Sequence, residues 1–328
     1  MSPQSVDPRR HGDIVFEEVL GGGPLVGIGT GRGFAKFAPR ALHIDTKDPE
    51  EYAAEISTLQ SARHPCILHL EVVFVRGPYA YELYPLCDLG AASSVMERHY
   101  PNGLPEKAIV SIAASLLQAL EYLHRRRIVH RSVRASHVLL DRNGGTKLAG
   151  MRHSRVLPAH WPRLFHMDDE LEDSLLWLAP EVLAQDLNGY DEQSDMYSFG
   201  VTLIEMANGF PPFSDMEGLE MLFEKLRGTT PRLLDSTTMP NNDDPPRFNR
   251  TFSTPFHDVT ELCLRVDVAS RPCASALRMH PFVSRTKKTK LKDLLPEAKA
   301  IDPRSFSPVS IGAGESMEVD EQRIEWTF

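Results

Sequence analysis

The chain has few cysteines, no long uninterrupted apolar run and no excess of positive charge. Its four cysteines are scattered over 328 residues without a C-x-x-C pair, which favours free thiols in a reducing compartment over a disulfide framework. The longest apolar-rich stretch, Ala108–His124, is interrupted by polar residues such as Ser115 and Glu121. It therefore predicts an amphipathic or buried helix and not a membrane span. The formal net charge of −9 argues against a general nucleic-acid binder.

The N-terminal residues argue against a secreted protein, and the spacing of the histidines argues against a metalloprotein. Residues 1–12 are polar and lack the apolar run of a signal peptide. We therefore expect a cytoplasmic protein without a membrane partner. A nuclear location is a second interpretation that the sequence leaves open. The 13 histidines show neither H-x-x-x-H nor a mixed Cys/His ligand spacing, and we therefore expect no metal site.

The order of predicted elements indicates a small β-rich part followed by a larger α-helical part. Apolar and polar residues alternate over 13–45, and further apolar runs at 67–75 and 79–86 predict strands, with one helix at 49–62. From residue 105 onward the apolar spacing is mostly helical, at 106–124, 191–208 and 215–227. This order predicts an α+β protein with two lobes inside one fold.

Composition divides the chain into three parts. Residues 1–12 form an N-terminus that we expect to be flexible, 13–284 form the folded domain, and 285–328 form a basic linker and a Ser/Pro/Gly/Glu-rich, flexible tail. Within the domain, residues 235–250 are rich in proline, asparagine and aspartate, and they predict a mobile loop insertion.

One eight-residue stretch keeps the length of a known catalytic loop without its reactive residues. Protein kinases carry H-R-D-x-x-x-x-N there, in which the Asp takes the proton of the substrate hydroxyl and the Asn holds a magnesium ion. Residues 130–137 read His-Arg-Ser-Val-Arg-Ala-Ser-His, so that Ser132 replaces the Asp and His137 replaces the Asn, while His130 and Arg131 are retained. A serine hydroxyl is uncharged near neutral pH and is a poor proton acceptor.

A second landmark of metal binding is also replaced. In protein kinases the magnesium-binding D-F-G triplet follows a strand shortly after the catalytic loop. Here the predicted strand 146–149 is followed by Gly150-Met151-Arg152. Gly150 has no side chain to supply the oxygen ligand that magnesium requires. Because His137 replaces the Asn as well, both protein ligands for magnesium are missing, and we expect a catalytically degenerate kinase fold.

The glycine-rich phosphate loop of kinases is eroded. Gly21, Gly23 and Gly27 belong to a glycine-rich run that nowhere gives the G-x-G-x-x-G spacing. Two interpretations stay open, a backbone loop that binds phosphates and a flexible strand-turn-strand.

The lysine that grips the nucleotide phosphates is displaced. Leu42 or His43 stands at its position, and Lys36, the nearest upstream lysine, would have to replace it from a neighbouring strand. Glu55, on the predicted helix 49–62, matches the glutamate that pairs with this lysine in kinases. Lys36 and Glu55 are therefore candidate nucleotide-binding residues, together with the three glycines.

The residues that hold a kinase fold together are intact. Ala179-Pro180-Glu181 matches the A-P-E that ends the activation segment, and Asp195 matches the helix aspartate that caps the catalytic-loop backbone. Arg271 matches an arginine near the C-terminal end of the kinase domain that forms a buried ion pair with the A-P-E glutamate. Removing one partner of such a pair costs about 3–5 kcal/mol. The groups that handle protons and metal are lost, whereas those that maintain the shape remain.

Taken together, these residues resemble the STE20-related adaptor pseudokinases. The run 129–139 and Gly150-Met151-Arg152 are similar to that family, as are the segments 177–183, 189–191, 205–209, 221–228 and 233–235. The resemblance covers nearly the whole chain and is most specific over 106–281. It implies a two-lobed protein-kinase fold, with a small β-rich N-lobe and a larger α-helical C-lobe, that serves as a catalytically inert adaptor.

The resemblance also implies two protein partners. Such adaptors bind and activate a serine/threonine kinase of the liver kinase B type, jointly with a helical-repeat scaffold of the calcium-binding-protein-39 (mouse protein 25) type. The scaffold captures a C-terminal Trp-Glu-Phe, and this chain ends Trp326-Thr327-Phe328. Aromatic anchors on a tail commonly supply much of the binding energy. We therefore assign scaffold binding to Trp326 and Phe328.

The resemblance does not decide whether this chain binds a nucleotide. Family members can bind ATP without magnesium, and the resemblance therefore implies that ATP without magnesium is a possible ligand of this chain. We expect that no cofactor is required. Two alternatives to the adaptor remain at this point: a residually active STE20-like serine/threonine kinase, and a module whose partner binding follows ATP occupancy.

Overall fold

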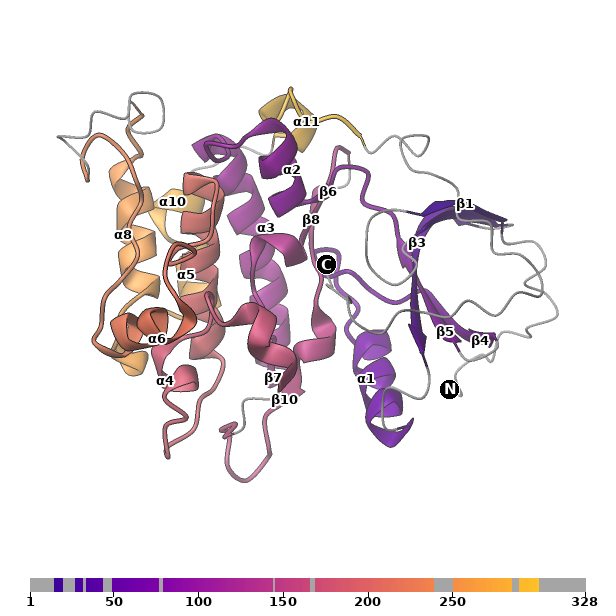
Figure 1. Cartoon of the computed structure of the whole chain (residues 1–328), viewed down its shortest axis with the longest axis horizontal. Helices are drawn as coiled ribbons and strands as arrows, with labels where there is room; N and C mark the ends of the chain where they lie inside the picture. Colours follow the sequence, from indigo (N-terminus) through magenta and orange to yellow (C-terminus); the bar gives the residue numbers. More distant parts are fainter. Residues whose placement is uncertain are drawn as a thin grey trace. The chain divides into compact units, whose positions relative to one another are not determined.

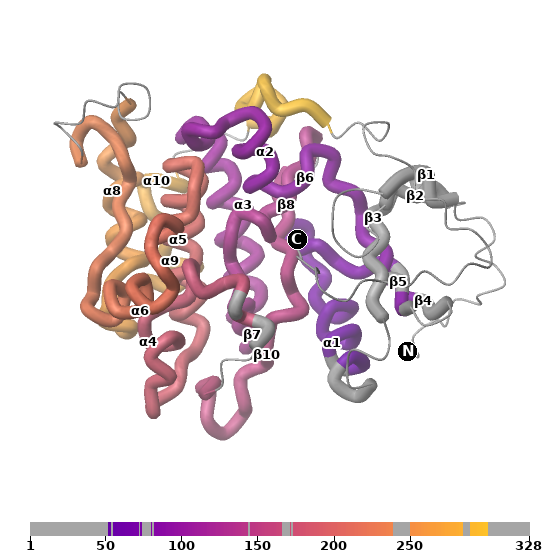
Figure 2. Tube along the Cα trace, viewed as in Figure 1, coloured from indigo at the N-terminus to yellow at the C-terminus, as the bar shows by residue number. Residues whose placement is uncertain are grey.

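A computed structural model describes most of the chain, and Figures 1 and 2 show its path. The described residues are 15–19, 27–31, 34–43, 49–76, 79–143, 145–165, 169–238, 250–284 and 289–300. The chain divides into two compact units. The smaller comprises residues 1–63, 68–88 and 300–328, and the larger comprises 64–67 and 89–299. A small strand-containing unit and a larger helical unit are what the order of sequence patterns predicted.

The smaller unit is built on a five-stranded antiparallel sheet in the order β1-β2-β3-β5-β4. Its elements are β1 (Val15–Val19), β2 (Gly27–Gly31), β3 (Phe34–His43), α1 (Pro49–Ser61), β4 (Val72–Arg76) and β5 (Tyr79–Pro85). The start predicted for the fourth strand, residue 67, is wrong, because Ile67 makes only an isolated bridge to Leu148 and regular pairing begins at Val72. Ile67 is apolar because it is buried, and an apolar run does not by itself distinguish burial from strand pairing.

A buried carboxylate ties α1 to the sheet. Glu82 on β5 is fully buried, and its two oxygens accept hydrogen bonds from Tyr52 Oη of α1 at 3.0 Å and from Tyr84 Oη at 2.8 Å. Hydroxyl donors compensate the cost of burying the carboxylate, which would be several kcal/mol without partners. The helix is thus positioned by Tyr52, one turn before Glu55.

The strand register corrects the expectation for Lys36. Lys36 was expected on a strand next to that of Leu42, yet both residues lie on β3. Leu42 is opposite Ala80 of β5, whereas Lys36 lies beyond the last pair, Phe37 opposite Pro85. Six residues of strand separate the two positions by about 20 Å. Lys36 therefore cannot replace a lysine at the position of Leu42.

The larger unit is mainly helical, with two short sheets beside the helices. Its helices are α2 (Ala92–His99), α3 (Glu106–Arg125), α4 (Pro180–Leu183), α5 (Gln193–Asn208), α6 (Gly218–Leu226), α8 (Thr254–Cys263), α9 (Ala274–Arg278), α10 (Pro281–Ser284) and α11 (Leu291–Leu294). One sheet joins β6 (Gly90–Ala91), β8 (Val138–Asp141) and β9 (Gly145–Leu148), and the other pairs β7 (Ile128–Val129) with β10 (Arg155–Val156).

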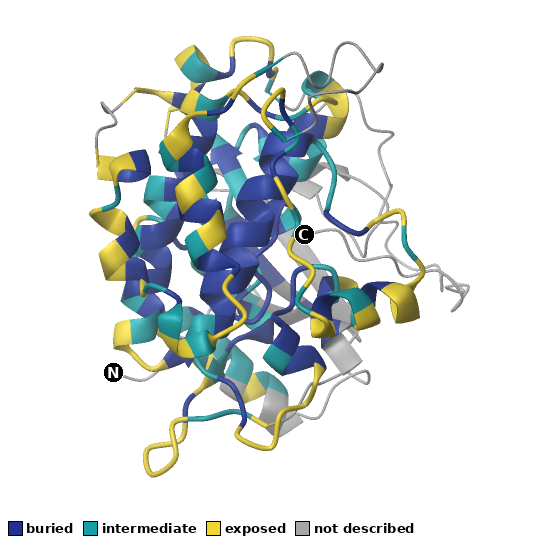
Figure 3. Cartoon of the chain, turned by 90° about the vertical axis from the view of Figure 1, so that its left-hand side faces the viewer, coloured by how far each residue is buried: buried dark blue, intermediate teal, exposed yellow. Residues whose placement is uncertain are grey.

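Two long helices form the core of this unit. α3 begins after Pro105, carries Glu106 in its first turn and ends on His124 and Arg125, so charges of the favourable sign stand at both ends of its dipole. α5 lies between α3 and α8 (Figure 1), and all but its first residue are buried. Figure 3 shows these buried helices surrounded by more exposed ones. A Cβ on Gly200 would lie 2.6 Å from the Cβ of Cys263, so the glycine lets α8 approach α5 closely.

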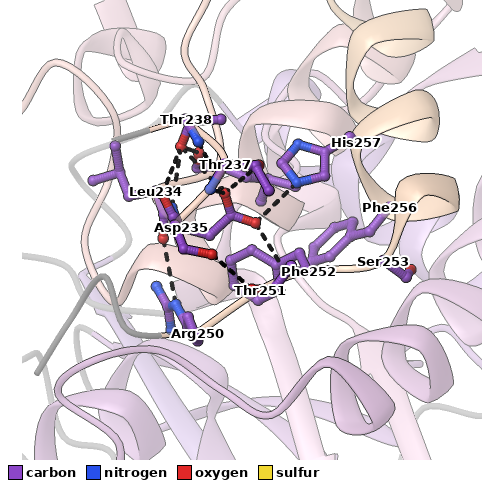
Figure 4. Close-up of polar contacts among 12 residues, drawn as sticks. Leu234, Asp235, Thr237, Thr238, Arg250, Thr251, Phe252, Ser253, Phe256 and His257 are labelled. Carbon is purple, nitrogen blue, oxygen red and sulfur yellow. Dashed lines mark hydrogen bonds and ion pairs between the residues drawn. The ribbon is translucent and has the colours of Figure 1, made fainter. Parts of the chain in front are cut away.

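The ends of the predicted loop insertion are tightly bonded, while residues 239–249 lie outside the described part of the chain. Asp235 is fully buried, and its carboxylate accepts bonds from Thr237, Thr238, the Phe252 amide at 2.9 Å and His257 Nε2 at 3.0 Å (Figure 4). Burial acts to raise the pKa of Asp235, but these hydrogen bonds outweigh it and lower the pKa overall. Residues 235–238 and 250–253 thereby hold each other in place.

The segment after residue 284 begins with an ordered stretch. α11 packs against α3, and Leu291, Leu295 and Ala298 are buried. The Glu297 amide also donates to Tyr100 Oη at 3.1 Å. Residues 289–299 therefore belong to the larger unit. In the described ranges no helix combines the length and the hydropathy that crossing a membrane requires.

Candidate functional site

The backbone of the loop that corresponds to a kinase catalytic loop is hydrogen-bonded to a carboxylate of α5. Asp195 is fully buried and accepts hydrogen bonds from the backbone amides of His130 and Arg131, both at 2.8 Å, and lies 2.9 Å from His124 Nε2. Burial acts to raise the pKa of Asp195, but hydrogen bonding and positive charge from His124 lower it overall. Arg131 has φ +69°, a left-handed conformation that costs a non-glycine residue about 1–2 kcal/mol. The two amide bonds to Asp195 oppose this strain.

His130 is a structural, uncharged residue. Its Nδ1 accepts from the Ser132 amide at 3.3 Å, so the ring proton is on Nε2, which donates to the carbonyl of Ala149 at 2.8 Å. The ring is fully buried, and this burial lowers its pKa. His130 therefore links the catalytic-loop position to the end of β9.

The Ser132 hydroxyl points into the protein and bonds to the activation segment. It is 1% exposed, and its Oγ lies 2.7 Å from the Oγ of Ser174, which is itself fully buried. A second contact, of 3.1 Å, joins it to His137 Nδ1. A hydroxyl in this arrangement connects two segments and has no free path to a substrate.

His137 is also turned inward. Its Nδ1 donates to the carbonyl of Ser132 at 2.7 Å, and its Nε2 lies 3.4 Å from Arg134 Nη2 and accepts from it. Its ring stacks on that of His153 with centroids 5.7 Å apart and planes 30° apart. Burial, and then the charge of Arg134, hold the pKa of His137 well below its ordinary value. The ring is therefore neutral near pH 7.

Gly150 lies directly against this ring. It has φ +82°, and a Cβ built on it would lie 2.5 Å from His137 Nδ1 and 2.7 Å from His137 Cγ. The two positions from which a kinase holds magnesium are thus adjacent, but one carries an imidazole and the other has no room for a side chain. These residues do not fit a magnesium ion. Among the described residues, no group of three or more His, Cys, Asp or Glu side chains could hold a metal.

Side chains of the larger unit bond to residues 173–178 of the activation segment. Arg134 Nη1 donates to the carbonyl of Asp173 at 2.5 Å, and its guanidinium lies 5.6 Å from the ring centroid of Trp177. Trp177 Nε1 donates to Glu205 Oε2 at 2.7 Å, and the same oxygen accepts from the Ala135 amide at 3.0 Å. Burial raises the pKa of Glu205 to about 7. Glu205 of α5 therefore joins the catalytic-loop position to the activation segment.

A buried lysine fixes the next part of the segment. Lys225 of α6 is fully buried, and its Nζ donates to the carbonyls of Leu175 at 3.1 Å, Leu176 at 2.6 Å and Leu178 at 2.9 Å. Burial lowers the pKa of Lys225 to about 7, but the charged form matches these three acceptors because an ammonium group has three N–H donors. Residues 175–178 are thereby tied to α6.

The end of the segment carries the ion pair expected from the sequence. Arg271 Nη1 lies 2.6 Å from Glu181 Oε1, and Nη2 lies 2.9 Å from Oε2. The arginine side chain is fully buried, and that of Glu181 is 8% exposed. This bidentate geometry is the strong form of an ion pair.

The structure brings together some of the sequence-derived residues. Ser132, His137 and Gly150 lie in one cluster, and His130 and Arg131 lie on Asp195. The candidate nucleotide residues belong to the smaller unit: Gly27 is the first residue of β2, Lys36 lies on β3, as does the degenerate position Leu42, and Glu55 lies on α1. Gly21, Gly23, Trp326 and Phe328 lie outside the described residues.

Five side chains of the site were missed in the sequence: Arg134, His153, Ser174, Glu205 and Lys225. Two of them carried a usable signal. Glu205 is the one carboxylate in the apolar run 199–207, and Lys225 follows the buried Met221 by four residues and hence shares its helix face. His153 had no such signal, because only the fold brings it against His137.

Comparison with known proteins agrees with this geometry. Residues 29–283 match the protein kinase domain. The chain is 36% identical over 267 residues to the STE20-related kinase adapter protein alpha of Rattus norvegicus, covering 71% of this chain and 68% of that protein. It is 36% identical over 243 residues to a STE20-related kinase adapter protein of Caenorhabditis elegans, covering 70% and 63%. The beta protein of Mus musculus is 32% identical over 285 residues, covering 76% and 68%.

Proposed function

Because this chain belongs to the protein kinase family and, within it, to the STE20-related kinase adapter proteins, we propose that it is a pseudokinase adaptor that activates another kinase. The partner is a serine/threonine kinase of the liver kinase B type, and a helical-repeat scaffold of the calcium-binding-protein-39 type completes the complex. The adaptor works in the cytoplasm, in keeping with its free cysteines.

The residues at the reacting positions support the proposal that this chain does not transfer phosphate. Ser132 cannot accept a proton near neutral pH, and its hydroxyl is already bonded to Ser174. Gly150 offers no carboxylate, and His137 offers a neutral imidazole that donates to a backbone carbonyl. Catalysis in kinases depends on positioning and on neutralising phosphate charge with metal ions, and these residues supply neither.

The observation that carries the proposal is the set of bonds that joins residues 173–181 of the activation segment to the rest of the larger unit. Kinases commonly need a phosphate on this segment to order it. Here Arg134, Glu205 and Lys225 bond to its residues 173–178, and Arg271 bonds to Glu181. Bonds of this kind lower the entropy that residues 173–181 lose when a partner binds them. This property suits a protein that acts by binding.

Activation is then a population shift in the partner. An adaptor that binds the active conformation of a kinase more tightly than the inactive one makes the active state dominant. A shift from 1:99 to 99:1 requires about 5.5 kcal/mol of differential binding. A rigid docking surface supplies this difference better than a mobile one, because a mobile surface adapts to both states.

Reconstitution with both partners tests the proposal. Activity of the partner kinase on a peptide should rise when this chain and the scaffold are added together. Lys225→Met should weaken the stimulation, because it frees residues 175–178. Lys147→Met should not, because Lys147 Nζ bonds to the Pro65 carbonyl, outside the activation segment. The proposal is wrong if the purified chain alone phosphorylates itself or a generic substrate with Mg-ATP.

The scaffold contact has its own test. We expect the double variant Trp326→Ala with Phe328→Ala to lose scaffold binding in a pull-down or by calorimetry, because buried aromatic anchors commonly contribute about 2 kcal/mol or more each. Gln322→Ala, in the same tail, is the matched control. Unchanged binding of the double variant would exclude the two aromatic residues as the anchor while leaving the kinase contact untouched.

A further inference from the structure

We propose that the imidazole rings of His137 and His153 form a plug that closes the magnesium position of the kinase fold, so that restoring a carboxylate at residue 150 does not restore metal binding. The inference rests on the proposed non-catalytic function and identifies what keeps the metal out. Removal of ligands alone would leave an open position at which a carboxylate at residue 150 could again contact a metal ion.

The first step of the argument is the space at Gly150. A Cβ there would lie 2.5, 2.7 and 2.8 Å from three atoms of the His137 ring. Distances below 3.0 Å are not tolerated by real Cβ atoms, so any side chain at residue 150 must displace the ring. The magnesium-binding aspartate of a kinase and the inward His137 therefore exclude each other.

The second step is that the His137 ring is not free to move. It is fully buried, donates to the Ser132 carbonyl, accepts from Arg134 and stacks on His153. His153 is 1% exposed and accepts at Nε2 from Arg152 Nε at 2.9 Å. Each ring thus supports the other, and interiors packed at normal density do not absorb an extra side chain without strain.

The third step is charge. Burial, and then the charges of the neighbouring Arg152, Arg134 and Arg131, lower the pKa of His153 to about 2. The positive field that disfavours a proton on this ring also disfavours a divalent cation beside it. The plug and its arginines therefore oppose a metal ion through both volume and charge.

A double-mutant cycle with a matched glycine tests the contact. Gly145 has φ +90°, like Gly150, but its Cβ would have no atom within 4 Å, so Gly145→Ala measures left-handed strain alone. We expect Gly150→Ala to lower Tm by roughly 5–10 °C and Gly145→Ala by roughly 2–4 °C. In a His137→Ala background the extra effect of Gly150→Ala should disappear. Equal shifts for the two glycines, or additive shifts for Gly150→Ala and His137→Ala, would overturn the plug.

Mn²⁺ binding tests the consequence, with paramagnetic broadening of backbone amide signals around residue 150 as the readout. The wild type and Gly150→Asp should show no selective broadening. The triple variant His137→Ala, Gly150→Asp, His153→Ser removes both rings without adding a ligand at residue 137, and it should bind Mn²⁺ at least about tenfold more tightly than either. Gly150→Asp that binds Mn²⁺ as tightly as the triple variant, or a triple variant that binds no better than the wild type, would refute the proposal.

These outcomes are separate from those of the adaptor proposal. A wild-type chain that binds Mn²⁺ at this position and still stimulates the partner kinase refutes the plug and keeps the adaptor. A chain that passes the Tm cycle but does not stimulate the partner kinase keeps the plug and refutes the adaptor.

Discussion

Two regions of the larger unit differ in the kind of group that they bury. We call Ser132, His137 and Gly150 the vacated position, because they replace the reactive residues of a kinase, and we call Asp195, Glu181 and Arg271 the frame. The frame keeps full charges in the buried carboxylate of Asp195 and the bidentate pair of Glu181 and Arg271. The vacated position uses neutral groups, in which the hydroxyls of Ser132 and Ser174 bond to each other and the ring of His137 donates to a carbonyl. Buried charges are costly to break and therefore hold a shape, whereas neutral hydrogen bonds fill space at a small net gain. The comparison indicates that the charged residues maintain the fold, whereas the replaced residues occupy positions that only a reaction would require to be charged.

The largest effect should come from the frame. Arg271→Met leaves Glu181 buried without its partner, and we expect the free energy of unfolding to fall by about 3–5 kcal/mol. Denaturant unfolding measures this change. Arg227→Met is the control, because Arg227 and its partner Glu224 have side chains that are 74% and 28% exposed, and such pairs contribute about 1 kcal/mol or less. Similar losses for both variants would contradict the distinction between frame and surface.

An intermediate effect should appear at Glu205, which bonds to both regions. Its pKa is about 7 in the folded state against 4.5 as the reference, so the folded state binds the proton more tightly. The contribution of Glu205 to stability should therefore fall as pH rises from about 4.5 to 7, by roughly 3 kcal/mol, and Glu205→Gln should lack this contribution. The stability difference between the two proteins, measured at several pH values, checks the slope. The exposed Glu220→Gln should give a difference that does not vary with pH, and a flat difference for Glu205→Gln would contradict the prediction.

The smallest effect should come from the vacated position. Ser132→Ala removes a neutral hydrogen bond, and we expect a loss of about 1 kcal/mol with no change in stimulation of the partner kinase. Ser136→Ala is the matched control, because Ser136 Oγ is buried without a hydrogen-bond partner among the described residues, so its removal should be neutral or stabilising. A loss from Ser132→Ala as large as that from Arg271→Met would mean that the vacated position also belongs to the frame.

Much of the fold was predictable, because local patterns determine it. The spacing over 106–124 predicted α3 to within one residue, and the pattern over 191–208 predicted α5 to within two. The start of β4 was wrong because burial alone explains the apolar residues that precede it. The register of β3 against β5 places Leu42 opposite Ala80 and Lys36 beyond the last pair. This register is set by the pairing of the two strands, and no local sequence signal predicts it.

The site was predictable only where a motif names the residue. Ser132, His137, Gly150 and Asp195 followed from their order along the chain, but their contacts did not. The stacking of His153 on His137 joins residues sixteen positions apart through the turn that Gly150 makes at the end of β9. Lys225 reaches carbonyls about fifty positions away, and a lysine is ordinarily expected at the surface. Such contacts arise from tertiary packing, which single-sequence patterns do not contain.

The bonds around Asp235 also identify a place where the chain can be lengthened by design. Since residues 235–238 and 250–253 are fixed to each other, the length of chain between them has little influence on the fold (Figure 4). Doubling the length of a loop with fixed ends costs about 0.6 kcal/mol. A fluorescent protein or an affinity tag inserted between 238 and 250 would therefore leave the fold and the tail ending in Trp326 and Phe328 unaltered. This position offers an internal label for following assembly of the complex when both partners are present.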